Sequence, residues 1–185
     1  MSAIPATQRK LRHARETFQL LQASARAIPL EREEVERRLS DFLSAAYSVE
    51  DVLKDDIAIT RGKKYAKSWV DSWWGKPPPR QALHTFMRNQ RVAELHHQGA
   101  IIGTTLREIS YPEYLQRAPA MQSGRHGGYY YGPQWSGPYG MEIPRIPVEI
   151  AILILGDAEV TEKCARYLSL LEQMVQAFLA AHPTP

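Results

Sequence analysis

Apolar residues recur every three or four positions along most of the chain, which is the spacing of a single buried helix face. The pattern predicts helices at about residues 7–27, 30–55, 63–74, 79–98 and 158–182. Residues that end helices stand between these segments, because Pro29 follows the first, a glycine and proline run follows the third and Gly99 follows the fourth. The predicted fold class is therefore mainly α.

Two segments depart from the helical period. Residues of about 100–109 and 145–155 are rich in β-branched side chains and predict a two-stranded β ribbon. The residues between them, 110–144, are expected to form a long loop before the last helix. The chain is thus predicted to be one domain over residues 1–185, an antiparallel four-to-five-helix bundle with a small β ribbon and this Gly/Tyr-rich loop.

Part of that loop, residues 123–140, is crowded with glycine and aromatic residues, including Tyr129, Tyr131 and Trp135. Exposed aromatic rings stack on nucleobases, because every base has a π face. The same composition also fits a flap that packs on its own domain or on a partner subunit. Both interpretations remain open from the sequence.

The composition is that of an ordinary soluble domain, with 44% hydrophobic and 23% charged residues in 185. The longest apolar run, residues 150–155, is too short to span a bilayer, and the first residues contain no secretory apolar segment. We therefore expect a cytoplasmic protein with no membrane partner. The single cysteine, Cys164, lies in a helical pattern and is expected to be a buried thiol.

Positive charge is concentrated between residues 61 and 91, where eight lysines and arginines face one acid, Asp71. Such an excess attracts RNA through counterion release, and it is equally typical of a solvated helix face. In the RNA-binding interpretation the substrate-binding residues include Lys63, Lys64 and Lys67.

Arg91 and His96 are the strongest candidates for chemistry. A histidine exchanges protons near neutral pH, and an arginine binds phosphate through its guanidinium group. The pair suits RNA cleavage without metal, with His96 as general base or acid and Arg91 stabilising the phosphorane. Positions five apart on a helix diverge by about 140°, so the pair meets at one phosphate only if the helix ends or bends near His96. The alternative is a surface arginine near Glu94 and a histidine at a fraying helix end.

Two neighbouring patterns belong to the same helix. His84, Arg88 and Arg91 follow steps of four and three and are predicted to present a row of cations on one face. Glu94 and His97 form a Glu-x-x-His element of the kind found in di-metal sites of helical bundles, but the chain has no second copy. No metal and no cofactor are therefore expected.

The chain resembles the HEPN (higher eukaryotes and prokaryotes nucleotide-binding) proteins, helical bundles with an Arg-x4-6-His signature. The segment RVAELH at 91–96 satisfies the signature, and FMRNQ at 86–90 is similar to the lead-in of bacterial members. The segment FLSAAYSV at 42–49 resembles part of their second helix. The order of elements is also similar, so the resemblance covers most of residues 7–180 apart from the aromatic loop.

The resemblance implies a metal-independent endoribonuclease, a toxin or defence component, in which Arg91 and His96 are catalytic and Arg88 and His97 assist. It also implies a homodimer, because family members commonly build the site from two facing protomers, and a cognate antitoxin as a partner. Family members usually carry a polar residue directly after the arginine, where this chain has Val92. That departure favours the alternative of a non-catalytic interaction protein, or one that binds RNA without cleavage, with the same fold.

Overall fold

The computed structural model describes residues 4–75, 77–95, 102–117 and 147–182. Within these ranges the chain is mainly helical and carries a small antiparallel sheet. The elements in chain order are α1 (Pro5–Arg26), α2 (Arg32–Arg61), α3 (Lys63–Gly75), α4 (Pro78–Leu95), β1 (Ile102–Ser110), α5 (Tyr111–Arg117), β2 (Pro147–Leu155), β3 (Ala158–Glu159) and α6 (Val160–Ala181).

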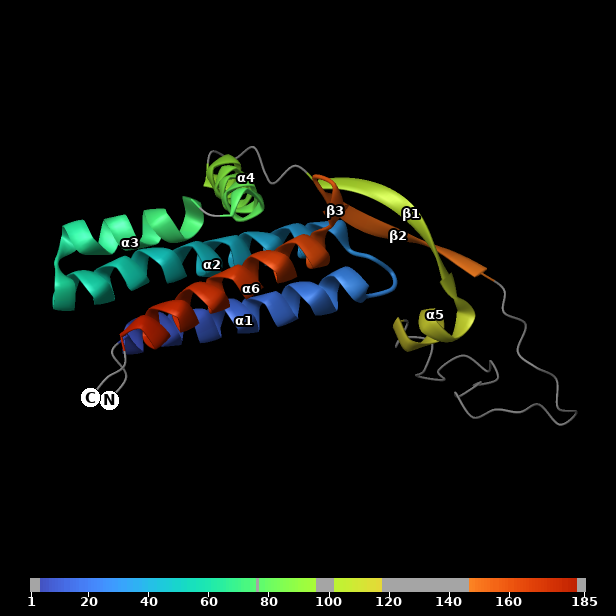
Figure 1. Ribbon diagram of the computed structural model, residues 1–185. Helices are drawn as coiled ribbons and strands as arrows, with labels where there is room; N and C mark the ends of the chain where they lie inside the picture. The colour runs from blue at the N-terminus through green and yellow to red at the C-terminus, as the bar shows by residue number, and fades with distance from the viewer. Residues whose placement is uncertain (1–3, 76, 96–101, 118–146, 183–185) are drawn as a thin grey trace, which may run out of the picture.

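The helices α1, α2 and α6 lie side by side along the long axis of the molecule, and α3 runs back along α2 (Figure 1). Each of these helices contributes an apolar stripe to one core, in which the ring centroids of Phe18 and Phe42 lie 5.7 Å apart. The start of α1 is tied to α2 because the Thr7 hydroxyl and backbone N–H both donate to Asp56 Oδ2, at 2.7 and 2.9 Å. We call this assembly of α1, α2, α3 and α6 the helical body.

Helix α2 continues six residues beyond the predicted end at residue 55. The polar run at 54–56 concealed the apolar stripe, which continues from Leu53 to the fully buried Ile57. The helix ends where Gly62 takes a positive φ of 86°, a conformation that favours glycine.

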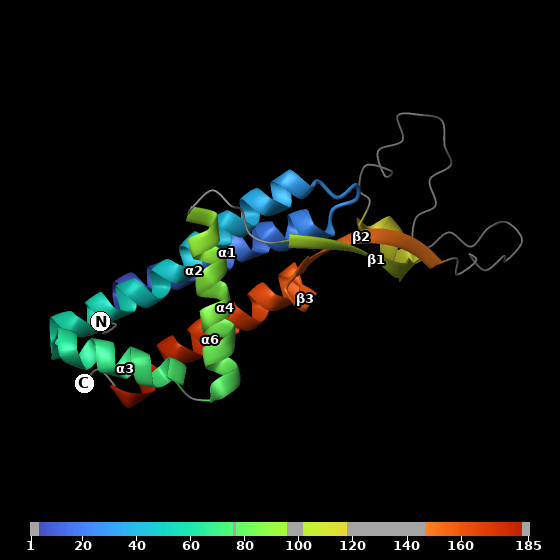
Figure 2. The ribbon, with the colours of Figure 1, turned by 90° about the horizontal axis from the view of Figure 1, so that it is seen from above.

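Helix α4 crosses the helical body over α2 and α6 instead of joining its long axis (Figure 2). Gly75 ends α3 and Pro77 stands before α4, and this change of direction occurs there because proline cannot continue a helix. Helix α1 lies on the side of α2 and α6 away from α4 (Figure 1). The candidate residues of α4 therefore belong to one face of the molecule and α1 to the other.

The predicted ribbon is confirmed, since β1 and β2 pair antiparallel over nine residues from Ile102 opposite Leu155 to Ser110 opposite Pro147. A third strand, β3, extends the sheet and was not predicted, because it spans two residues. The prediction that a loop begins at residue 110 was wrong, because β1 ends at Ser110 and α5 follows directly. An ion pair one helical turn apart, Arg117 to Glu113 at 2.5 Å, supports this short helix.

The remainder of the predicted loop, residues 118–146 with the aromatic segment, lies outside the described residues. Among the helices that the structure describes, none is long and apolar enough to cross a membrane.

Candidate functional site on helix α4

Helix α4 is held on the helical body by an apolar face. Met87 is 2% exposed, and Phe86 packs against the turn between β2 and β3 at Gly156. The Lys163 ammonium lies 4.4 Å from the centre of the Phe86 ring, within the range of a cation–π contact. These contacts fix α4 against both α6 and the sheet.

A buried polar cluster joins α4 to α2. His84 Nε2 lies 2.9 Å from Glu50 Oε2, and the Lys54 ammonium donates to Glu50 Oε1 at 2.5 Å. The His84 ring stacks on Trp74 with the centroids 4.1 Å apart and the planes 5° from parallel. The side chains of His84 and Glu50 are only 13% and 9% exposed. We call Glu50, Lys54, Trp74 and His84 the α2–α4 cluster.

The charges of this cluster are set by opposing effects. Burial raises the pKa of the Glu50 carboxyl, but the hydrogen bonds from His84 and Lys54 outweigh it and lower the pKa to about 2. Burial raises the pKa of the neighbouring Tyr167 hydroxyl, and the negative charge of Glu50 raises it further. Glu50 is therefore ionised and Tyr167 neutral at physiological pH.

The prediction that His84, Arg88 and Arg91 form an exposed row of cations was wrong for His84, whose side chain faces inward to Glu50 and Trp74. The physical reason is that α4 lies across α2, so that this part of its polar stripe meets a buried carboxylate. Arg88, one turn later, is exposed, and its positive charge is close enough to Asp51 to oppose the rise that burial causes in the pKa of that carboxyl. Arg91 is half-buried in the next turn.

The structure describes α4 as far as Leu95. Both His96 and His97 lie outside the described residues, as does the predicted helix end at Gly99, and the Glu94 side chain is not described either. The expected meeting of Arg91 with His96 therefore stays a prediction. The residue after Arg91, Val92, is 44% exposed.

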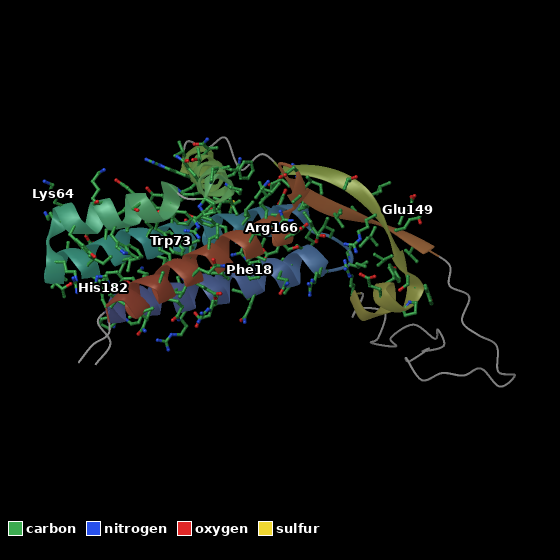
Figure 3. All side chains as sticks on the ribbon, in the orientation of Figure 1. Phe18, Lys64, Trp73, Glu149, Arg166 and His182 are labelled. Atoms are coloured by element: carbon green, nitrogen blue, oxygen red, sulfur yellow. The ribbon has the colours of Figure 1, made fainter. Side chains whose placement is uncertain are left out.

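The predicted substrate-binding lysines occupy a different place. Lys63, Lys64 and Lys67 are exposed in the first turns of α3, and Lys67 pairs with Asp71 at 2.7 Å. Figure 3 shows Lys64 at the end of α3 that is remote from α4. The structure brings Arg88 and Arg91 together on α4 but does not bring these lysines to them.

Arg80, another cation of the basic stretch, packs against Trp73. Its guanidinium donates to the Trp73 carbonyl at 3.0 Å and lies 3.8 Å from the centre of the Trp73 ring. The basic stretch of residues 61–91 is therefore divided among the start of α3, the corner before α4 and α4 itself. It forms no single basic surface in the part of the chain that the structure describes.

Sequence reasoning missed Glu50, Trp74 and Tyr167 as neighbours of α4. A signal for Glu50 was present, because it is a carboxylate within the buried stripe of α2, four residues after Ala46 and three before Leu53. A charged residue on an apolar helix face requires a partner, and His84 and Lys54 supply it.

Within the described ranges no group of three histidine, cysteine or acidic side chains is placed to hold a metal ion. No protein-family model, curated protein or solved structure matches the chain.

Proposed function

We propose that the chain is a metal-independent endoribonuclease of the HEPN type, with its active site at the C-terminal end of α4. The observation that carries the proposal is the position of Arg91, half-buried in α4 and five residues before His96, on a helix anchored to the rest of the fold. The proposal includes the finer architecture, a four-to-five-helix bundle formed by the helical body with α4 packed across it.

The reaction follows from the chemistry of the two side chains. His96 accepts the proton of a ribose 2′-hydroxyl, whose oxygen attacks the adjacent phosphorus. Arg91 stabilises the negative charge that develops on the phosphorane oxygens. The bond from phosphorus to the 5′ oxygen then breaks, His97 protonates this leaving oxygen, and the products are a 2′,3′-cyclic phosphate and a 5′-hydroxyl. Arg88, exposed one turn before Arg91, binds a neighbouring phosphate.

The packing of α4 supports this assignment. A guanidinium stabilises a transition state only when it is held in place before the reaction, because reorientation during the reaction would cost free energy. The α2–α4 cluster and the Phe86 contact hold the helix on two sides. They act as positioning groups for Arg91.

The angle between Arg91 and His96 on a continuous helix supports a site completed by a second protomer. The two side chains diverge by about 140° in one helix, whereas two facing copies bring an arginine of one protomer near a histidine of the other. We therefore propose a homodimer. In this proposal the protein is a cytoplasmic toxin or defence component that a cognate antitoxin restrains.

The proposal is tested by cleavage of a structured RNA in the presence of EDTA. We expect Arg91→Ala and His96→Ala each to reduce the rate about 100-fold or more, since each removes a transition-state interaction. Arg26→Ala and His13→Ala are the matched controls, because both residues are exposed on α1. Equal activity in all five proteins, or activity in none, would overturn the proposal.

The second candidate is a helical interaction or RNA-binding protein without catalysis. The exposed Val92, directly after Arg91, favours it because an apolar side chain suits a protein contact better than a phosphate site. This candidate predicts that the wild type cleaves no RNA, and that any RNA affinity falls with salt and survives His96→Ala.

A further inference from the structure

The first turns of α1 carry a second concentration of positive charge. Four of the seven residues from Arg9 to Arg15 are lysine or arginine, and Glu16 is the only acidic residue of the helix. All four cations are exposed. They lie on the side of α2 and α6 away from α4 (Figure 1), so they are separate from the candidate site described above.

A groove of about 360 Å³ lies between this part of α1 and the last turns of α6. Its floor is closed, because Leu11 and Val175 are only 4% and 1% exposed. Its walls are basic and amide side chains. The lining residues are Gln8, Leu11, Arg12, Arg15, Val175 and Gln176.

The cations beside the groove differ in how they are paired. Arg15 is held by Glu172 of α6 at 2.6 Å, an ion pair that spans the two helices. Arg9, Lys10 and Arg12 make no ion pair with any side chain that the structure describes. Of these three, Arg12 lines the groove and Arg9 lies one helical turn before it, so both charges are available to an anion there.

The groove suits a phosphate backbone better than an acidic amphipathic helix. A docked helix buries its apolar side chains on an apolar surface, and Leu11 and Val175 expose little area for such a contact. Phosphates need cations and hydrogen-bond donors, which Arg12 and the amides of Gln8 and Gln176 provide. Cations one helical turn apart, such as Arg9 and Arg12, also suit an anion that repeats along a chain.

We propose that the groove between α1 and α6 is a second RNA-binding surface, which holds the phosphate backbone through Arg12, with Arg9 one helical turn before it. The choice of RNA among polyanions rests on the proposed function. The surface binds without reading bases, since the groove presents no aromatic side chain among its lining residues. Through this surface the protein binds RNA without contacts from α4.

Binding of a labelled 2′-O-methyl oligouridylate of about 20 nucleotides tests the proposal, because this RNA lacks the 2′-hydroxyl and resists cleavage. Fluorescence anisotropy is measured from about 50 to 200 mM salt. We expect Arg12→Gln to weaken binding about 3- to 10-fold and to reduce the slope of log affinity against log salt by about 0.7. The double variant Arg9→Gln/Arg12→Gln should reduce this slope by about twice as much. Arg26→Gln is the matched control, since it removes the same charge from an exposed position at the other end of α1.

Equal weakening by Arg12→Gln and Arg26→Gln would overturn the proposal, because the effect would then reflect total charge. Poly-L-glutamate that binds as tightly as the RNA and is weakened by Arg12→Gln would also overturn it in favour of an acidic protein partner. Unchanged circular dichroism of Arg12→Gln confirms folding. Loss of cleavage in Arg91→Ala with intact 2′-O-methyl RNA binding separates the active-site proposal from this one.

Discussion

Replacement of Glu50 by glutamine tests how the α2–α4 cluster holds α4. The carboxylate of Glu50 accepts hydrogen bonds from His84 and Lys54, and its side chain is 9% exposed. Glutamine has the same shape and still accepts a hydrogen bond, but it carries no charge. The change therefore isolates the electrostatic part of the contact between the two helices.

The pKa of Glu50 gives the expected magnitude. Its pKa falls from 4.5 to about 2 in the folded protein, although burial alone would raise it, because the hydrogen bonds and charges of His84 and Lys54 prevail. At 1.36 kcal/mol per pH unit this corresponds to about 3 kcal/mol of stability. Since the folded pKa is depressed, this stabilisation is present above pH 4.5 and is lost as the pH falls towards 2.

Urea unfolding followed by circular dichroism measures the effect. We expect Glu50→Gln to be less stable than the wild type by about 3 kcal/mol near pH 7 and by about 1 kcal/mol near pH 3. Asp51→Asn is the control, because burial raises the pKa of this neighbouring carboxyl and its charge does not stabilise the fold. A difference that is absent near pH 7, or equal at both pH values, would refute the reasoning.

Two further predictions concern the turn beside α4 and the single cysteine. Gly156→Ala should destabilise the fold by about 2 kcal/mol, because the residue has a φ of 70° and a Cβ would lie 3.0 Å from Phe86 Cζ. A fall in Tm checks this, and Gly75→Ala, which meets no atom within 4 Å, should leave Tm unchanged or raise it. Burial raises the pKa of the Cys164 thiol, so a disulfide reagent at mildly alkaline pH should react with it only after unfolding. Fast reaction of the native protein would contradict the second prediction.

The helical part of the fold could be predicted because each long helix buries one regular stripe. The stripe of α6, which includes Cys164, Leu171 and Phe178, predicted a helix at 158–182 and the structure places it at Val160–Ala181. Short elements were missed for the opposite reason. The two residues of β3 and the seven residues of α5 contain too few positions to establish a period.

The neighbours of α4 could not be predicted, because they depend on how one helix crosses another. His84 meets Glu50 across 34 residues of sequence, and the spacing within α4 does not indicate which neighbour its polar stripe faces. The same limit applies to charge. Lys64 and Arg91 belong to the same basic stretch of sequence but lie in α3 and α4, two helices that point in different directions (Figures 2 and 3).

The most direct test of the central proposal is the chemistry of the RNA ends that the purified protein produces in EDTA. The account predicts 2′,3′-cyclic phosphate and 5′-hydroxyl ends from the wild type, formed about 100-fold more slowly by Arg91→Ala. Mass spectrometry of a short RNA distinguishes these ends from 3′-hydroxyl and 5′-phosphate ends. Ends of the second kind, a complete loss of activity in EDTA, or an undiminished rate in Arg91→Ala would contradict the account.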